Sequence, residues 1–414
     1  MASTLITNIR SLVNVRTTVK LLRGNELAEL PCMENAFLVI ENGRIAEYGV
    51  MQQFPNFKLQ GPDKTIDASG QFVLPAWCDS HTHLVFAASR EEEFVDKIKR
   101  FTYAEIAAKG GGILNSAGKL NAMSEDELFN LAWKRLDEVS RLGTGAIEIK
   151  SGYGLTTEGE LKMLRVIKKL KEKSGLLIKS TFLGAHTFPL EFKENHQGYI
   201  DLIIDEMLPV IAGENLADYI DVFCESGFFS PDETETICRA GMKYGLKPKI
   251  HANQLNLSGG VETGVRLAAL SVDHLETMNV SAINELANSQ TIGTLLPTAA
   301  FFLRMPFQPA RKLIDAGCSI ALASDYNPGS SPSGNMNLVV AMSCIGMKML
   351  PEEAINAATI NGAYAMDIQN EAGSISVGKK ANLIFTKPIP SLAYMPYSFG
   401  TNLIDKVMIN GEFL

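Results

Sequence analysis

Short apolar runs alternate with longer amphipathic segments from about residue 72 to residue 329. One amphipathic segment, SEDELFNLAWKRLDEV, begins with a capping box of Ser124 and Glu127 and continues with apolar residues at a helical period. Eight strands followed by helices predict an α/β protein built on a (β/α)8 barrel, with a doubly wound open sheet as the alternative. The predicted strands are FVLPAWCDSHTH, GAIEIKSG, LIKSTFLGAH, YIDVFCES, KPKIHAN, ALSVDHLE, TIGTLLPT and SIALASDYNPG.

The two ends of the chain have a different pattern, in which β-strands follow one another without helices between them. AFLVIENGRIAEYGV reads as two strands joined at a turn, and SISVGKKANLIF and VMINGEFL supply short apolar runs near the C-terminus. We therefore predict a small β-sandwich domain built from residues 1–70 plus 375–414. The barrel domain is predicted to span residues 71–374.

Composition narrows the possible functions. The formal net charge of -8 argues against a nucleic-acid partner, which would require clustered Lys and Arg. No apolar stretch reaches the roughly 20 residues needed to cross a bilayer, so no membrane association is expected. The six cysteines have no CxxC spacing and no signal peptide is apparent, so we expect reduced thiols in a cytoplasmic protein.

Histidines gather at the C-terminal ends of the predicted strands, where the active site of a (β/α)8 barrel lies. Five of the six histidines occupy such positions, and His81 and His83 are two residues apart, so they face the same way on a strand. A scattered distribution would not do this, whereas one convergent polar site would. The residues at the strand ends are His81, His83, Lys150, His186, Glu225, His251, His274 and Asp325. His196, in EFKENHQGY, is expected to be a solvated loop residue.

An imidazole-rich site with one carboxylate suits one Zn(II) or Fe ion that activates water. Asp325 is expected to bind the metal and accept a proton, with a helix N-cap as its alternative role. His274 is expected to polarise the substrate oxygen, the alternative being a buried histidine bonded to Asp273.

HTH after a strand, a later strand-end histidine, DHLE and a final strand-end aspartate resemble the amidohydrolase superfamily, whose β-sandwich is built from both chain ends. A narrower set of motifs resembles the imidazolonepropionase family. These motifs are HTHLVFAASREEEF, AAKGGGIL, EIKSGYGL, TFLGAH, DVFCESGFFS, KIHANQL, SVDHLE and SDYNPGSSP. HTH alone marks the superfamily, while EIKSGYGL and DYNPGSSP are far more specific.

This resemblance implies roles for individual residues. The metal ligands would be His81, His83, His251 and Asp325. Contacts to the imidazolone would come from Arg90, Tyr153, His186 and Gln254, and a loop for substrate or product from Asn327, Gly329 and Ser330. Independently of the resemblance, a substrate with a carboxylate tail requires a cation, and the Arg90 fork suits a carboxylate.

Each of these roles has a structural alternative. The alternative role of Arg90 is one end of a surface salt bridge with the glutamates at 91–93. The alternative role of Tyr153 is packing in a turn, although a flexible SGYG loop would let its hydroxyl reach the site. Two-metal members of the superfamily carry a bridging lysine at the end of the fourth strand. Lys150 ends the second strand instead, so one metal is expected. The alternative role of Lys150 is pairing with a neighbouring carboxylate.

The implied activity is hydrolytic ring opening of 4-imidazolone-5-propanoate to N-formimidoyl-L-glutamate in histidine degradation. One alternative is a mononuclear amidohydrolase acting on another cyclic amide or aminated heterocycle, and another is a non-catalytic metal-binding barrel. Gln254 stands where deaminases of the superfamily carry a proton-shuttling glutamate, which weakens a deaminase interpretation. The expected partner is a small molecule with a carboxylate tail, and a homodimer is one expected assembly because this fold often pairs through barrel helices.

Overall fold

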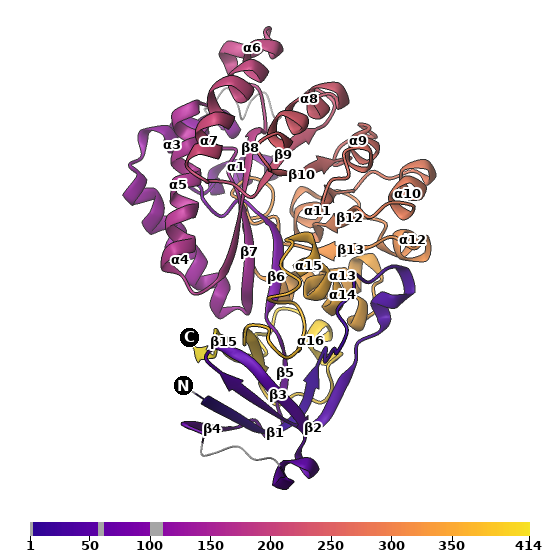
Figure 1. Cartoon of the computed structure of the whole chain (residues 1–414). Helices are drawn as coiled ribbons and strands as arrows, with labels where there is room; N and C mark the ends of the chain where they lie inside the picture. The colour runs from indigo at the N-terminus through magenta and orange to yellow at the C-terminus, as the bar shows by residue number, and fades with distance from the viewer. Residues whose placement is uncertain (1–2, 57–61, 100–110) are drawn as a thin grey trace.

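The computed structural model describes residues 3–56, 62–99 and 111–414, which form a barrel and a separate sheet (Figure 1). The eight barrel strands are parallel and pair in chain order. They are β6 (Trp77–Thr82), β7 (Thr144–Lys150), β8 (Leu177–Ala185), β9 (Tyr219–Cys224), β10 (Lys247–Ala252), β11 (Ser271–His274), β12 (Ile292–Leu295) and β13 (Ile320–Leu322).

The first and last barrel strands meet through the segment that follows β13. The backbone N–H of Asp325 donates to the carbonyl of His81 over 3.0 Å, and the N–H of His83 donates to the carbonyl of Tyr326 over 2.9 Å. These bonds nearly close the ring. The predicted barrel is confirmed, and the open-sheet alternative is wrong.

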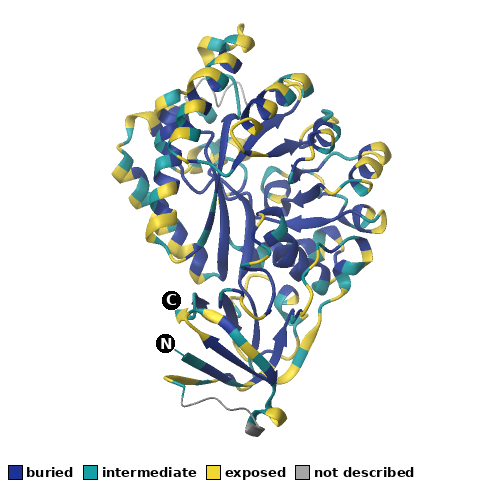
Figure 2. Ribbon diagram, viewed as in Figure 1, coloured by how far each residue is buried: buried dark blue, intermediate teal, exposed yellow. Residues whose placement is uncertain are grey.

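Helices cover the outside of the barrel, with buried faces toward the strands and exposed faces toward solvent (Figure 2). The predicted capping box is present, since Ser124 Oγ accepts from the N–H of Glu127 at the start of α4. The α- and π-helices of this region are α1 (Glu91–Ile98), α3 (Ile113–Ala122), α4 (Glu125–Arg141), α5 (Thr157–Lys173), α6 (His196–Asp201), η4 (Leu202–Met207), α7 (Leu208–Gly213), α8 (Pro231–Met242), α9 (Gly260–Arg266), α10 (Val280–Ala287), α11 (Pro297–Leu303), α12 (Ala310–Asp315), α13 (Met336–Met347), α14 (Pro351–Ala358) and α15 (Ile360–Ala365).

Both chain ends build the second sheet, as predicted, and lie together below the barrel in Figure 1. Its strands are β1 (Ser3–Val13), β2 (Cys32–Glu41), β3 (Arg44–Val50), β4 (Lys64–Asp67), β5 (Phe72–Pro75), β14 (Leu383–Thr386), β15 (Ile404–Ile409) and β16 (Glu412–Phe413). The remaining short helices are η1 (Gly24–Ala28), η2 (Met51–Asn56), η3 (Leu190–Phe192) and α16 (Tyr394–Tyr397).

Two Asn-Gly turns, one near each end of the chain, pack against each other. Asn42 and Gly43 both have positive φ (51° and 77°), the geometry of a two-residue hairpin turn, and Asn410 and Gly411 repeat it. A Cβ on Gly43 would lie only 2.6 Å from the carbonyl oxygen of Asn410, so glycine is required for the two turns to pack together.

The first predicted strand is in fact two strands. Residues 72–75 form β5, which pairs with β1 and β14, whereas β6 begins at Trp77 and enters the barrel. The chain changes sheets at Ala76, whose N–H donates to the carbonyl of Asn382. An apolar run does not reveal such a change, because both strands are buried on both faces. The exact domain boundaries at 70 and 374 stay predictions.

Candidate active site

Five histidines and one aspartate meet at the C-terminal end of the barrel, where the sequence places them. The ring centroids of His81 and His251 are 4.5 Å apart, and the ring of His83 stacks on His186 at 5.3 Å. A small cavity of about 70 Å³ opens between these groups. It is lined by His83, Tyr153, His186, Phe223, His251, Gln254, His274, Asp325, Asn327 and Ser330.

The arrangement of nitrogen and oxygen atoms in this cluster suits a metal ion. Asp325 Oδ1 lies 3.5 Å from His81 Nε2 and 3.6 Å from His83 Nε2. Tetrahedral ligands at about 2.1 Å from a metal lie about 3.4 Å apart. His81 Nε2 and His251 Nε2 are buried without a hydrogen-bond partner, as expected of atoms whose lone pairs are directed at a metal.

Two overlapping groups could hold the ion, and they share His81. One comprises His81, His83 and Asp325, and the other His81, His251 and His274, with the ligand atoms of each group within 4.8 Å of one another. The four predicted ligands therefore lie in one continuous cluster that also includes His274.

Two buried aspartates orient the histidines from behind. Asp273 Oδ2 lies 2.7 Å from His81 Nδ1, and Asp221 Oδ2 lies 3.0 Å from His251 Nδ1. A carboxylate hydrogen-bonded at Nδ1 holds the proton there and leaves Nε2 free to bind a metal. His81 has this bond, whereas His251 Nδ1 and Asp221 Oδ2 are close but lack hydrogen-bond geometry. Burial, with nearby positive charges, holds the pKa of His81 and of His251 well below the usual value, so both rings are neutral.

Lys150 forms ion pairs with these aspartates, so the predicted alternative role, pairing with a neighbouring carboxylate, is correct. Its Nζ lies 2.6 Å from Glu148 Oε1, 2.8 Å from Asp221 Oδ2 and 3.6 Å from Asp273 Oδ2, all fully buried. Burial disfavours the ammonium, but the carboxylates outweigh it and raise the pKa of Lys150 above its usual range. The lysine therefore stays charged and neutralises the two aspartates behind the histidines.

Four residues of this interior network were not among the candidates from sequence, namely Glu148, Asp221, Lys249 and, as a partner of His81, Asp273. A signal was available. Glu148 stands two residues before Lys150 in GAIEIK, and Lys249 stands two residues before His251 in KPKIH. Residues two apart on a strand share a face, so this spacing places both charged residues on the barrel-interior face.

His274 does not pair as its alternative role required. Its Nδ1 lies 3.4 Å from Glu276 Oε1, whereas Asp273 points toward His81. Burial lowers the pKa of His274, but Glu276, Asp325 and Asp273 outweigh burial and raise it above the usual value. For Asp325, burial raises the pKa to about 6.

The loop bearing Tyr153 is bonded to α5 by three hydrogen bonds, an arrangement that the expectation of a flexible SGYG loop did not include. Tyr153 is 4% exposed, and the N–H groups of Gly152, Gly154 and Leu155 all donate to the carboxylate of Glu160. These bonds join the loop to the first turn of α5, only five to eight residues further along the chain. Tyr153 nevertheless reaches the cavity.

The loop after β13 is bonded directly to Asp325. Asn327 Oδ1 accepts from the N–H groups of Gly329 and Ser330, each over 2.8 Å, and Asn327 Nδ2 donates to the carbonyl of Asp325 over 2.7 Å. Ser330 Oγ donates to Asp325 Oδ2 over 3.2 Å. Asn327 and Ser330 thus hold Asp325 in place and line the cavity, whereas Gly329 bonds to Asn327 and is not among the lining residues.

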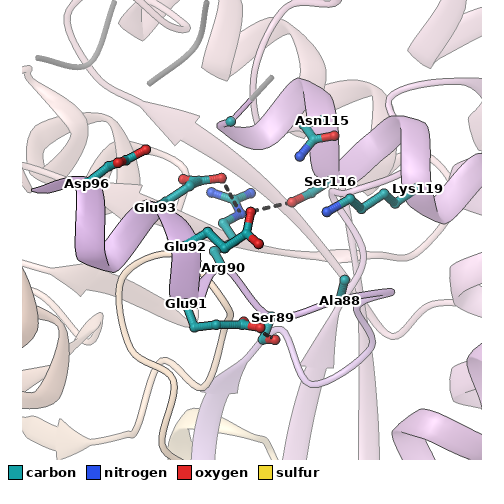
Figure 3. Close-up of a pocket in the computed structure, with 11 residues that line it drawn as sticks. Ala88, Ser89, Arg90, Glu91, Glu92, Glu93, Asp96, Asn115, Ser116 and Lys119 are labelled. Atoms are coloured by element: carbon teal, nitrogen blue, oxygen red, sulfur yellow. Dashed lines mark hydrogen bonds and ion pairs between the residues drawn. The ribbon is translucent and has the colours of Figure 1, made fainter. Parts of the chain in front are cut away.

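Arg90 lies beside this loop and forms an ion pair with Glu93, one of the glutamates named in its alternative role, although each side chain is only 14% exposed. Its Nε donates to Ser116 Oγ over 2.9 Å and is 3.9 Å from Glu93 Oε1, while Nη2 is buried and unpartnered (Figure 3). A Cβ on Gly329 would be 2.8 Å from Arg90 Nη1, and the guanidinium carbon lies 5.8 Å from the centre of the Tyr153 ring.

Two further candidates complete the comparison with the sequence. Gln254 lines the cavity. His196 is not a simple loop residue, because it begins α6, stacks on Phe188 at 3.6 Å and lies 3.1 Å from Glu233. The first half of the AAKGGGIL motif lies outside the described residues.

A nearly closed (β/α)8 barrel with buried histidines and an aspartate at its C-terminal end is the architecture of a metal-dependent hydrolase. A model of the amidohydrolase family matches residues 72–414. The imidazolonepropionase of Flavobacterium johnsoniae is 60% identical over 412 residues, covering 99% of this chain and all of that protein. That of Christiangramia forsetii is 56% identical and covers 99% of each chain.

Among solved structures, guanine deaminase of E. coli has a TM-score of 0.76 at 12% identity, covering all of this chain and 99% of that one. This likeness supports the fold alone. The chain belongs to the amidohydrolase family and, within it, to the imidazolonepropionases. In the described part of the chain, no helix is both long and apolar enough to span a bilayer.

Proposed function

We infer that this chain hydrolyses 4-imidazolone-5-propanoate to N-formimidoyl-L-glutamate, the ring-opening step of histidine degradation. The observation that carries this inference is the cluster of unpartnered imidazole nitrogens beside Asp325, in a member of the imidazolonepropionase family. The enzyme acts on a small molecule. None of the six cysteines forms a disulfide. Cytoplasmic location, absence of nucleic-acid binding and a homodimer remain predictions.

We propose that His81, His83, His251 and Asp325 hold one Zn(II) or Fe ion. The support is the 3.5 and 3.6 Å spacing at Asp325 Oδ1 and the neutral, carboxylate-oriented rings of His81 and His251. When bound, such an ion supplies Lewis acidity that makes water nucleophilic near neutral pH. Lys150 is already neutralised by three carboxylates, which argues against a second, lysine-bridged metal.

The protein side chains then divide the proton transfers. Asp325, with its pKa raised to about 6 by burial, accepts the proton of the attacking water and can return it to the departing ring nitrogen. His274 is charged more readily than a free histidine and lies within the cluster, so it polarises the ring carbonyl and stabilises the developing oxyanion.

Seven residues are proposed to bind the substrate. The ring would contact Tyr153, His186 and Gln254, all of which line the cavity. Burial lowers the pKa of His186 to about 4, so its ring is neutral and suited to hydrogen bonding the imidazolone. Asn327, Gly329 and Ser330 would contact the substrate or product, and Arg90 would bind the propionate.

An amidohydrolase acting on another heterocycle and a non-catalytic metal-binding barrel are the competing functions. Arg90 separates the first competing function from our proposal, because binding a neutral heterocycle does not require a cation. Turnover of imidazolonepropionate together with metal analysis distinguishes the non-catalytic metal-binding barrel from our proposal. The purified protein is expected to contain close to one metal ion per chain and to hydrolyse this substrate.

Replacing Arg90 with alanine is expected to lower kcat/KM for imidazolonepropionate by roughly ten- to a hundred-fold, because a charge-assisted hydrogen bond in a partly desolvated site contributes about 1.5–3 kcal/mol. Metal content should not change, since Arg90 is not a proposed ligand. Arg90→Lys should recover only part of the loss, because an ammonium lacks the planar fork. Steady-state kinetics and metal analysis on the three proteins test this.

The control is a substrate analogue without the carboxylate, on which wild type and Arg90→Ala should be equally poor. Full activity of Arg90→Ala on imidazolonepropionate would show that Arg90 does not bind the propionate and would favour the wider amidohydrolase alternative.

A further inference from the structure

The carboxylate of Glu160 is the anchor of the loop between β7 and α5. Its Oε2 accepts from the N–H of Gly152 over 2.9 Å, and its Oε1 accepts from Gly154 over 2.7 Å and Leu155 over 3.0 Å. Glu160 is completely buried. Among the described residues, no Lys or Arg is recorded in an ion pair with it.

A buried carboxylate without a cation is costly, and it persists where its hydrogen bonds hold something in place. The bonds here cross from a helix to a loop that has no ladder of its own. Glycine permits this approach, because a Cβ on Gly154 would lie 2.3 Å from the backbone nitrogen of Glu160, and Gly152 has a φ of +110°.

The loop transmits this fixed position to two groups of the active site. The carbonyl of Gly152 lies 3.0 Å from His186 Nδ1, which places the proton of His186 on that nitrogen. The Tyr153 ring lies 5.5 Å from His186 and 5.8 Å from His83, between centroids. The Glu160 carboxylate is therefore linked through the loop backbone to the position of Tyr153 and to the nitrogen of His186 that faces the cavity.

We propose that Glu160 is a positioning residue for substrate binding, acting through the backbone of residues 152–155 on Tyr153 and His186. Glu160 does not line the cavity, and its hydrogen bonds go to the loop backbone rather than to the proposed metal ligands. This inference rests on the proposed function, because it assumes that Tyr153 and His186 contact the imidazolone. It predicts an effect on substrate affinity rather than on metal content.

Glu160→Gln tests the proposal, since it keeps the shape but removes the charge and turns an NH2 group toward backbone donors. We expect KM to rise roughly tenfold while kcat changes less than about threefold, as for lost binding that is equal in ground and transition states. Metal content should equal that of wild type. In a Tyr153→Phe, His186→Asn background the same change should raise KM much less, because the residues act as one unit.

Glu353→Gln is the matched control. Glu353 is also buried, accepts from the N–H of Leu350 over 2.7 Å and pairs with Arg311, far from the loop in sequence. It should lower the melting temperature without raising KM. If Glu160→Gln does not fold, Glu160→Asp, which keeps the charge but cannot reach all three N–H groups, replaces it.

A second measurement needs no substrate. The ¹⁵N resonances of His186 should show an Nδ1–H tautomer in wild type and a mixture in Glu160→Gln. An unchanged tautomer and unchanged KM, or a KM increase matched by Glu353→Gln, would overturn the positioning role. Failure of the wild type to hydrolyse imidazolonepropionate would instead overturn the proposed function, while the tautomer would still report on Glu160.

Discussion

His251→Ala is expected to lose its metal and nearly all of its activity. The substitution removes one of four proposed ligands and leaves Asp221 without its imidazole partner, so metal affinity should fall at least a hundred-fold. Lewis-acid activation supplies several kcal/mol, and about 4 kcal/mol corresponds to roughly a thousand-fold in kcat/KM. Metal analysis after dialysis, followed by steady-state kinetics, measures both effects.

His196→Ala is the control for this experiment, because His196 is the histidine outside the cluster and its side chain is 44% exposed. It should retain the metal and the activity. A His251→Ala protein that keeps one metal per chain would contradict the proposed ligand set. Adding excess metal should restore part of the activity of His251→Ala only if weaker binding is the cause of the loss.

Lys150→Met is expected to lower the free energy of unfolding by about 3–5 kcal/mol, the usual cost of removing one partner from a buried ion pair. Glu148, Asp221 and Asp273 would be left facing one another without this cation. Because Asp221 and Asp273 orient His251 and His81, metal affinity should also fall by roughly ten- to a hundred-fold. Denaturant unfolding of the apoprotein and metal titration separate the two effects.

Lys249→Met is the matched control from the same barrel interior. Lys249 is equally buried and contacts Glu148 and the carbonyl of Ser80; among the described residues its ion pair is with Glu148 alone, although its charge also lowers the pKa of Asp273. Lys249→Met should lose stability comparably and lose less metal affinity than Lys150→Met, because only Lys150 lies within ion-pair distance of Asp221 and Asp273. Equal losses of metal affinity in both variants would mean that Lys150 acts only through general stability.

Much of the architecture could be predicted from the sequence because it depends on local patterns. Every barrel strand was located from its apolar run, and the hairpin was located from Asn42 and Gly43, which can adopt the positive φ of its turn. The histidine cluster followed from one rule, that strand ends meet at one face of a barrel. The ligand roles depended on resemblance to known motifs.

The sequence alone therefore determined the barrel, the sheet built from both ends and the gathering of histidines, since periodicity and turn chemistry are properties of neighbouring residues. Tertiary structure decided the split of the first apolar run, the pairing of Asp273 with His81 rather than His274, and the bonding of the loop to Glu160. The first two features depend on strand stagger and on contacts across the closed barrel, whereas the Glu160 bonds, which join residues five to eight apart, depend on how one loop folds against the helix that follows it. His81 and Asp273 are 192 residues apart, and no local pattern specifies which atoms of such distant residues will meet.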